Sequence, residues 1–173
     1  MTTIAIKDGI LAADTRITWD NIYGFSRKIH LVHDMVFAIA GSVEMEELIL
    51  DFYRRTLKKK PALPKKFEII LIKNKKIYIS QNSLIFSVLK QKYYAIGSGW
   101  QCAMMAMKIG LTAFEAVKTT SELDVYTNNI IDTNIISEYV SKPYENVFST
   151  QVEKTNINSF ITLTINNILK QGE

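Results

Sequence analysis

An Asp-Gly pair at residues 8–9 constrains the fold of this chain more than any other feature of its sequence. It separates two short runs, residues 2–7 and 10–16, that are rich in residue types common in β-strands. Such a pair is the strongest short-range signal for a hairpin closed by a two-residue loop. In that register Thr3 faces Asp14. The hairpin therefore brings Asp14 beside the beginning of the chain.

A second strand pair is predicted in the stretch that follows, over residues 28–42. If this stretch folds back at residues 33–34, Lys28 lies opposite Ile39. Lys28 and Gly41 then lie toward the same end of the hairpin. The two hairpins together would gather a hydroxyl, an amine, a carboxylate, a lysine and a strand-end backbone N–H.

This set of groups makes chemical sense if Met1 is removed, as methionine before a small residue usually is. Thr2 then carries its hydroxyl and a free α-amino group on one residue. An N-terminal amine can act as the base that activates a threonine hydroxyl, and its pKa of about 8 lies near neutrality. A charged Lys28 nearby would lower that pKa further, and Asp14 would keep Lys28 charged and oriented. Thr2 is thus a candidate nucleophile.

Six segments resemble, in the family's order, the proteasome β-subunit superfamily of N-terminal nucleophile hydrolases and especially its HslV-like members. They are residues 2–4, 13–18, 27–29, 40–42, 96–99 and 124–128. A single short segment of this kind is common by chance, whereas six in order form a specific pattern. The resemblance covers residues 2 to 130 and implies an α+β fold, the four-layer αββα sandwich.

The resemblance also implies roles for individual residues. The backbone N–H of Gly41 would stabilise the developing oxyanion of the substrate. Ser98, Asp124 and Thr127 match the family's secondary hydrogen-bond network around the amine. Arg16 is expected to play a supporting role. With Thr2, Asp14 and Lys28 these residues complete the site of a threonine endopeptidase.

The partners expected from the resemblance are a polypeptide substrate and further copies of the chain in a ring that encloses the sites. An ATPase unfoldase is a candidate partner of such a ring. Two other functions remain open: a non-catalytic assembly protein that keeps the scaffold, and a hydrolase of small amides. The short middle of the chain, its unfamiliar tail and Asn128, where many relatives have glycine, favour the first of these. Retention of the four residues Thr2, Asp14, Lys28 and Gly41 favours catalysis.

The 173 residues suit one globular domain. We expect residues 1–133 to form the hydrolase domain and residues 134–173 to form a C-terminal extension packed on it. The single Cys102 fits a reducing compartment. No secretory signal precedes Thr2 and no apolar run is long enough to span a bilayer, so we expect a cytoplasmic protein without membrane contact.

We expect no metal or organic cofactor and no nucleic-acid partner. His30 and His33 are the only histidines and lie in one hairpin, which is too few ligands for a metal site. The lysine-rich residues 58–66 are interpreted as a solvated loop closed by prolines, because no aromatic or glycine-rich cradle for phosphate accompanies them. Cys102 lies in an apolar stretch and is interpreted as a core residue.

The remaining elements follow from local patterns. Ser42 is a helix cap, and Met45, Leu48, Ile49 and Phe52 recur at the spacing of one buried helix face. Strands are predicted at 67–72, 76–79, 84–88, 93–96 and 124–127, a buried helix at 100–109, and a helix beginning with a capping box at 112–115. Weak helical character over 134–150 and alternation over 160–165 complete the prediction.

Overall fold

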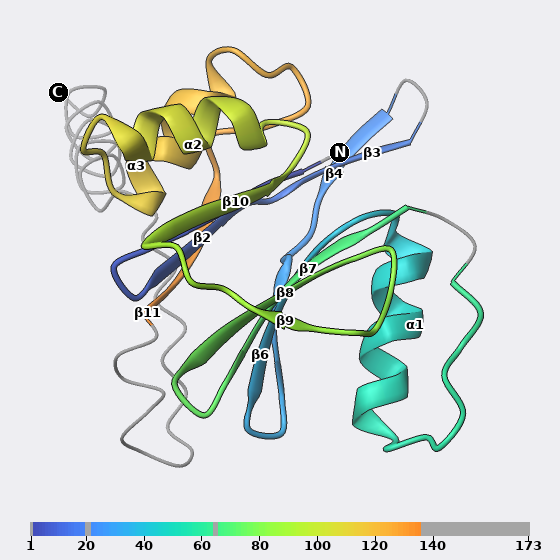
Figure 1. Cartoon of the computed structure of the whole chain (residues 1–173). Helices are drawn as coiled ribbons and strands as arrows, with labels where there is room; N and C mark the ends of the chain where they lie inside the picture. The colour runs from blue at the N-terminus through green and yellow to red at the C-terminus, as the bar shows by residue number, and fades with distance from the viewer. Residues whose placement is uncertain (1, 20–21, 64–65, 136–173) are drawn as a thin grey trace, which may run out of the picture.

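The computed structural model describes residues 2–19, 22–63 and 66–135, and within them two antiparallel sheets face each other (Figure 1). The strands of the first sheet follow the order β10-β1-β2-β11, with bounds Tyr93–Gly97, Thr3–Lys7, Ile10–Asp14 and Ile131–Ile135. The strands of the second sheet follow the order β5-β6-β7-β8-β9, with bounds Ile29–Val32, Met35–Ala40, Glu68–Lys73, Lys76–Gln81 and Ser87–Val88.

Helices cover the outer face of each sheet. Helix α1 (Val43–Arg54) packs on the second sheet, and helices α2 (Trp100–Lys108) and α3 (Ala113–Ser121) pack on the first. Apolar side chains of both sheets, among them Ile4, Leu11, Ala38 and Ile70, fill the space between them. This arrangement is the predicted α+β fold with four layers, αββα, and the prediction is confirmed.

Both predicted hairpin registers are confirmed. Asp8 and Gly9 have φ values of 50° and 76°, as the type I′ turn requires, and Lys7 pairs with Ile10. In the second hairpin Ile29 pairs with Ala38, and the Ile39 N–H donates to the carbonyl of Lys28 over 3.3 Å. Asp14 and Lys28 are thereby carried to the same end of the sandwich.

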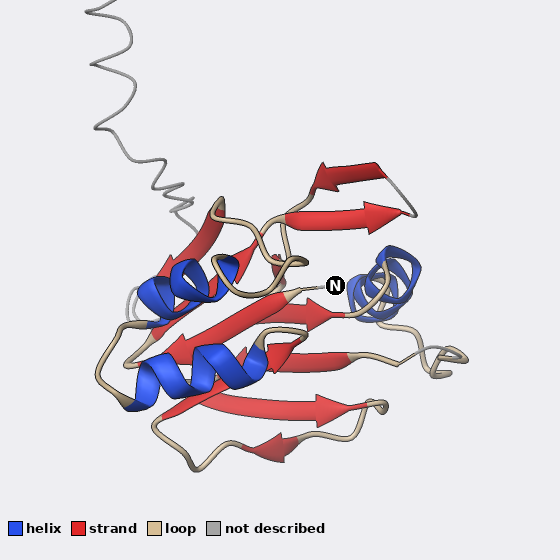
Figure 2. Ribbon diagram, turned by 90° about the horizontal axis from the view of Figure 1, so that it is seen from above, coloured by secondary structure: helices blue, strands red, loops and turns tan. Residues whose placement is uncertain are grey.

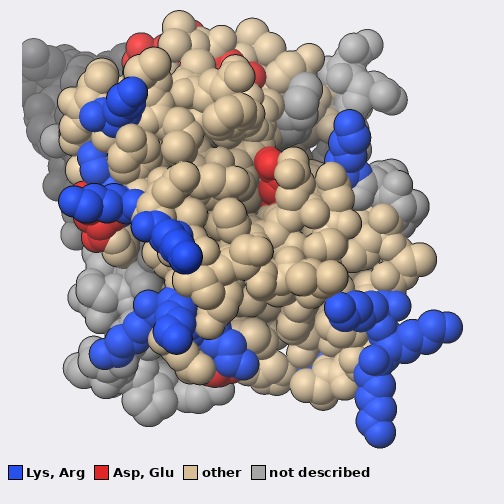
Figure 3. Space-filling view, in the orientation of Figure 1, with Lys and Arg blue, Asp and Glu red and all other residues tan. Residues whose placement is uncertain are grey.

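Helix starts also follow the sequence. The Ser42 hydroxyl accepts the N–H of Met45, and Thr112 and Glu115 form the predicted capping box. The exposed Lys58–Lys60 segment follows α1, as predicted for a solvated loop, and basic side chains lie at the lower edges of the face in Figure 3.

The predictions for α1, α2 and residues 84–88 are wrong in part. Leu48 is 43% exposed, because the buried face of α1 is formed by Met45, Ile49 and Leu50 instead. Helix α2 is not buried all round: Ala103, Ala106 and Met107 face the sheet, while Met105 is 61% exposed. The segment predicted as a strand over 84–88 pairs only at Ser87 and Val88.

Residues 124–127 form a turn rather than a strand. The Asp124 carboxylate accepts the N–H of Tyr126 over 3.1 Å, which closes an Asx turn, and Val125 is 71% exposed. The strand begins instead at Ile131. This strand, β11, crosses the domain boundary predicted after residue 133. The helix predicted over 134–150 and the strand predicted over 160–165 fall almost wholly outside the described residues.

A separate two-stranded hairpin projects from the sandwich beside the N-terminal end of β1 (Figure 2). It consists of β3 (Arg16–Trp19) and β4 (Ile22–Phe25). Its side chains Ile22, Tyr23 and Phe25 are 71%, 61% and 58% exposed. Among the described helices none has the length and apolar character needed to cross a bilayer.

Candidate active site

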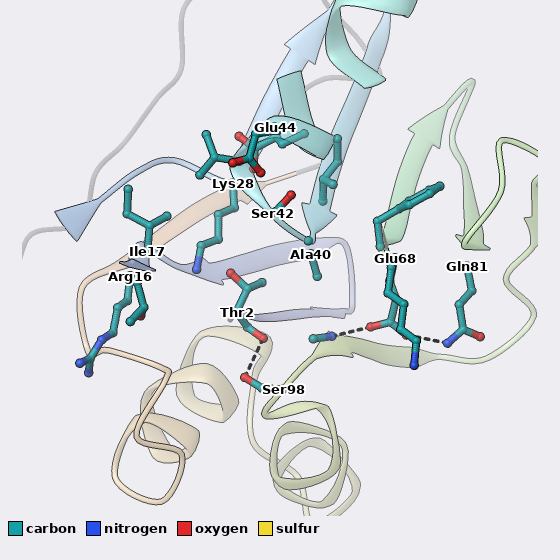
Figure 4. A pocket seen from close by; sticks show the side chains of 18 of the residues that line it. Thr2, Arg16, Ile17, Lys28, Ala40, Ser42, Glu44, Glu68, Gln81 and Ser98 are labelled. Carbon is teal, nitrogen blue, oxygen red and sulfur yellow. Dashed lines mark hydrogen bonds between the residues drawn. The ribbon is translucent and has the colours of Figure 1, made fainter. Parts of the chain in front are cut away.

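Thr2 lies directly before β1 and lines a cavity of about 570 Å³ between the two sheets. Lys28, Gly41, Ser98 and Arg16 line the same cavity, and the Lys28 side chain points toward Thr2 (Figure 4). The cavity is open to solvent, while Thr2 itself is only 5% exposed. Residues predicted from five separate parts of the sequence therefore meet at one concave surface.

A buried ion pair stands beside Thr2. The Nζ of Lys28 lies 2.8 Å from Oδ1 of Asp14, and the two side chains are 3% and 0% exposed. Asp14 Oδ1 also accepts the N–H of Thr3 over 2.7 Å, and its Oδ2 accepts the N–H of Arg16 over 3.0 Å. Each oxygen of the buried carboxylate therefore has at least one hydrogen-bond donor within the protein.

The environment of Lys28 changes its proton affinity. Burial lowers the pKa of Lys28 below its ordinary value of 10.5. The Asp14 carboxylate and, more weakly, the charge of Glu46 offset part of this shift. Lys28 is therefore held in place by Asp14 while its ammonium loses a proton more readily than that of an exposed lysine.

The turn after β10 touches the backbone of Thr2. The N–H of Ser98 donates to the Thr2 carbonyl over 2.7 Å. Gly97 has φ +90°, and any side chain at this position would overlap the same carbonyl oxygen. Only glycine fits this close approach without displacing Thr2.

Behind Ser98 lies a network of hydroxyl groups around one carboxylate. Asp124 Oδ2 accepts hydrogen bonds from Ser98 Oγ over 2.7 Å and from Thr127 Oγ1 over 2.8 Å. The Thr3 hydroxyl lies 2.6 Å from that of Thr127 and extends the network to β1. Partial burial would raise the pKa of Asp124, but the hydrogen bonds from Ser98, Thr127 and the Tyr126 N–H outweigh it and hold the pKa below 3.8.

Gly41 follows β6 directly and lies at the cavity wall. A Cβ there would come within 3.1 Å of the Cβ of Phe67, so a larger residue would push against the start of the next strand. This position is compatible with a backbone N–H directed at a bound substrate.

Arg16 and Asn128 lie close to the site and make contacts through their side chains. The guanidinium of Arg16 lies 5.0 Å from the ring centre of Tyr23, and no acidic side chain among the described residues pairs with it. Asn128 does not need a glycine-like backbone: its φ is not positive, and its side chain accepts the N–H of Thr15 over 3.1 Å and donates to the Thr15 hydroxyl over 3.2 Å.

Three residues of this region were not singled out from the sequence. Thr3 extends the hydroxyl network, Gly97 contacts Thr2, and Glu68 accepts the N–H of Gly97 over 2.8 Å. Thr3 and Gly97 lie within segments 2–4 and 96–99, which resemble the family, whereas no sequence signal pointed to Glu68. Within the described residues no three His, Cys, Asp or Glu side chains are grouped as metal ligands.

No protein-family model and no curated protein sequence matches the chain significantly. Solved structures do match it. BPH of Thiobacillus denitrificans in complex with epoxomicin superposes with a TM-score of 0.61 at 20% identity, over 77% of this chain and 96% of that chain. The chain has the HslV-like fold. HslV of Trypanosoma brucei superposes with a TM-score of 0.55 at 18% identity, over 77% of this chain and 97% of that chain.

The position of the cavity follows from the two hairpins that line it. It lies where the hairpin β1–β2 and the hairpin β5–β6 end side by side, between the sheets (Figure 4).

Proposed function

We propose that this chain is a threonine-type peptidase whose nucleophile is Thr2 after removal of Met1. One observation carries the proposal: the buried Lys28–Asp14 pair beside Thr2. Burying two charges costs several kcal/mol each before their attraction is counted, and apolar residues of similar size often serve the fold as well or better. A pair kept there despite this cost is typical of a site that tunes a neighbouring group.

In the proposed reaction the Thr2 Oγ1 attacks the scissile carbonyl carbon and its proton passes through a water to the Thr2 amine. The Lys28 ammonium lowers the pKa of that amine, and Asp14 orients Lys28. The N–H of Gly41 stabilises the negative oxygen of the tetrahedral intermediate. The protonated amine then gives its proton to the leaving nitrogen, and the C–N bond breaks to leave an ester on Thr2. Water hydrolyses this ester and restores the hydroxyl.

Ser98, Asp124 and Thr127 are proposed to hold the Thr2 amine by hydrogen bonds, and Arg16 to support the cavity wall. Support comes from the Ser98 N–H contact with the Thr2 carbonyl, which fixes this network next to the proposed base. An ionised Asp124 in the network would favour the protonated amine that forms during attack.

We further propose that copies of the chain assemble into a ring that encloses the sites, with polypeptides as substrates and an ATPase unfoldase as a candidate partner. The exposed apolar side chains of the β3–β4 hairpin support assembly. The predicted division into a hydrolase domain, residues 1–133, and an extension packed on it, residues 134–173, stays a proposal, and strand β11 reaches two residues past that boundary. The proposed location is the cytoplasm.

The test compares hydrolysis of a fluorogenic peptide set and of small amides by the wild type and by Thr2→Ala. We expect peptide hydrolysis that disappears in Thr2→Ala and is inhibited by epoxomicin, the compound bound to BPH in its solved complex. Hydrolysis of small amides alone would favour the small-amide hydrolase. No Thr2-dependent hydrolysis of either class would favour the non-catalytic assembly protein.

A further inference from the structure

Glu68 begins β7 in the second sheet and lines the same cavity as Thr2. Its Oε2 accepts the N–H of Gly97, in the first sheet, over 2.8 Å, and its Oε1 accepts a longer bond of 3.3 Å from Gln81 Nε2 (Figure 4). The proposed mechanism gives Glu68 no role. Its hydrogen bond nevertheless joins the two sheets at the end that carries the site.

Gly97 is in direct contact with the proposed nucleophile residue. Its backbone approaches the Thr2 carbonyl so closely that no side chain fits between them, and the next residue, Ser98, donates its N–H to that carbonyl. A displacement of Gly97 therefore displaces Thr2. The carboxylate of Glu68 holds the same glycine through its backbone N–H.

The partner of Glu68 across the sheet is Ala40, which directly precedes Gly41. Glu68 thus links the strand end that bears the proposed oxyanion N–H to the turn that contacts Thr2. The Lys28–Asp14 pair is a second polar contact between the same two parts of the molecule. The two contacts flank Thr2 and together fix the separation of the sheets at the cavity.

We infer that Glu68 is a positioning residue: its hydrogen bond to the Gly97 N–H sets the distance between the Thr2 hydroxyl and the Gly41 N–H. The inference rests on the proposed peptidase function. Misplacement of reacting groups by about 1 Å can cost about a hundredfold in rate, so a lost contact at this place affects turnover more than substrate binding.

The kinetic test uses Glu68→Ala, Glu68→Gln and, as a matched control, Glu47→Ala on the exposed side of α1. For Glu68→Ala we expect kcat to fall about tenfold to a hundredfold with KM changed less than about threefold. Glu68→Gln keeps an oxygen that can accept the Gly97 N–H and should retain most of kcat. A Gln variant as slow as the Ala variant would overturn positioning by this hydrogen bond, because charge would then be what matters.

A second measurement does not depend on turnover. Amide hydrogen exchange of the peptide containing Gly97 should be faster in Glu68→Ala and close to wild type in Glu68→Gln and Glu47→Ala. Unchanged exchange in Glu68→Ala would overturn the inference even if activity fell. Failure of the proposed function is recognised separately, since wild-type protein would then show no Thr2-dependent hydrolysis before any change at Glu68.

Discussion

The ammonium of Lys28 and the carboxylate of Asp14 form an ion pair with almost no access to solvent. Each charge depends on the other, because an unpaired charge in this position would lose its hydration without compensation. Asp14 has backbone N–H donors besides Lys28, from Thr3 and Arg16. If Lys28 is replaced, the Asp14 carboxylate therefore keeps two hydrogen-bond donors.

Lys28→Met should keep the fold and lower the rate of acylation about a hundredfold or more, because the Thr2 amine loses its charged neighbour. Asp14→Asn should have a similar effect. The double variant should be no slower than the slower single variant, since both residues act on one amine. The measurement is single-turnover kinetics, with Lys76→Met at an exposed position as the control. An unchanged rate in Lys28→Met would show that the pair is structural only.

Gly97 and Gly110 offer a matched pair of substitutions. Both have positive φ, +90° and +115°, but a Cβ at Gly97 overlaps the Thr2 carbonyl, whereas nothing lies within 4 Å of one at Gly110. Gly110→Ala should cost about 1–2 kcal/mol of stability through its backbone alone. Gly97→Ala should cost about 3 kcal/mol or more and also lower turnover. Denaturant unfolding checks both, and equal losses would show that the contact with Thr2 is looser than described.

At the scale of elements, local sequence signals correctly predicted the two hairpins and the starts of helices α1 and α3. The Asp8-Gly9 turn fixes one register, and the Ser42 and Thr112 caps act within three residues of themselves. The strand predicted at 124–127 is wrong for a local reason as well. Its β-prone Val125 and Tyr126 are exposed, because the Asp124 side chain bonds the backbone into a turn.

The contacts that complete the site are different in kind. Glu68 meets Gly97 across two sheets and 29 residues, and Thr3 meets Thr127 across 124 residues. No period or spacing in the sequence encodes such contacts, which arise only when the sheets are stacked. The family resemblance was enough to name Thr2, Asp14 and Lys28 from the sequence. The hydrogen bonds of Glu68 and Thr3 that hold the site together could not be predicted in that way.

Strand β11 carries a buried carboxylate whose titration should be visible in stability. Burial raises the pKa of Asp132 above 3.8, although Arg27 and His30 oppose the shift and Glu46 pairs with His30. The folded state then holds this proton more tightly than the unfolded state does. The resulting stabilisation is present below pH 3.8 and is lost as the pH rises through the higher folded-state pKa.

The Asp132→Asn variant has no carboxyl group at this position, so it cannot lose stability through ionisation there. The difference in melting temperature, variant minus wild type, should therefore become more positive as the pH rises from acid toward neutrality. Thermal unfolding of both proteins at a series of pH values checks it, with His33→Asn, in the exposed hairpin turn, as the control. A difference that stays constant or falls over this range would contradict the prediction.

At the scale of the whole molecule, the described residues include exposed apolar side chains on the β3–β4 hairpin and between β8 and β9. We expect multimers in light scattering, and Ile22→Ser with Phe25→Ser on the projecting hairpin should shift them toward monomer. Ile85→Ser, at a position 74% exposed between β8 and β9, serves as the control and should leave the assembly unchanged. A clean monomer of the wild type at high concentration would remove the ring from the proposal.

The central claim is that the chain reacts through its own first threonine, and the most direct test concerns Met1. With Met1 retained, the Thr2 nitrogen is an amide and cannot accept a proton near neutral pH. Intact-mass spectrometry and peptide turnover are measured on the same preparations, which differ in the fraction that retains Met1. Turnover should rise in proportion to the fraction lacking Met1 and should vanish in Thr2→Ala. Full turnover from a preparation that retains Met1 would contradict the N-terminal nucleophile mechanism.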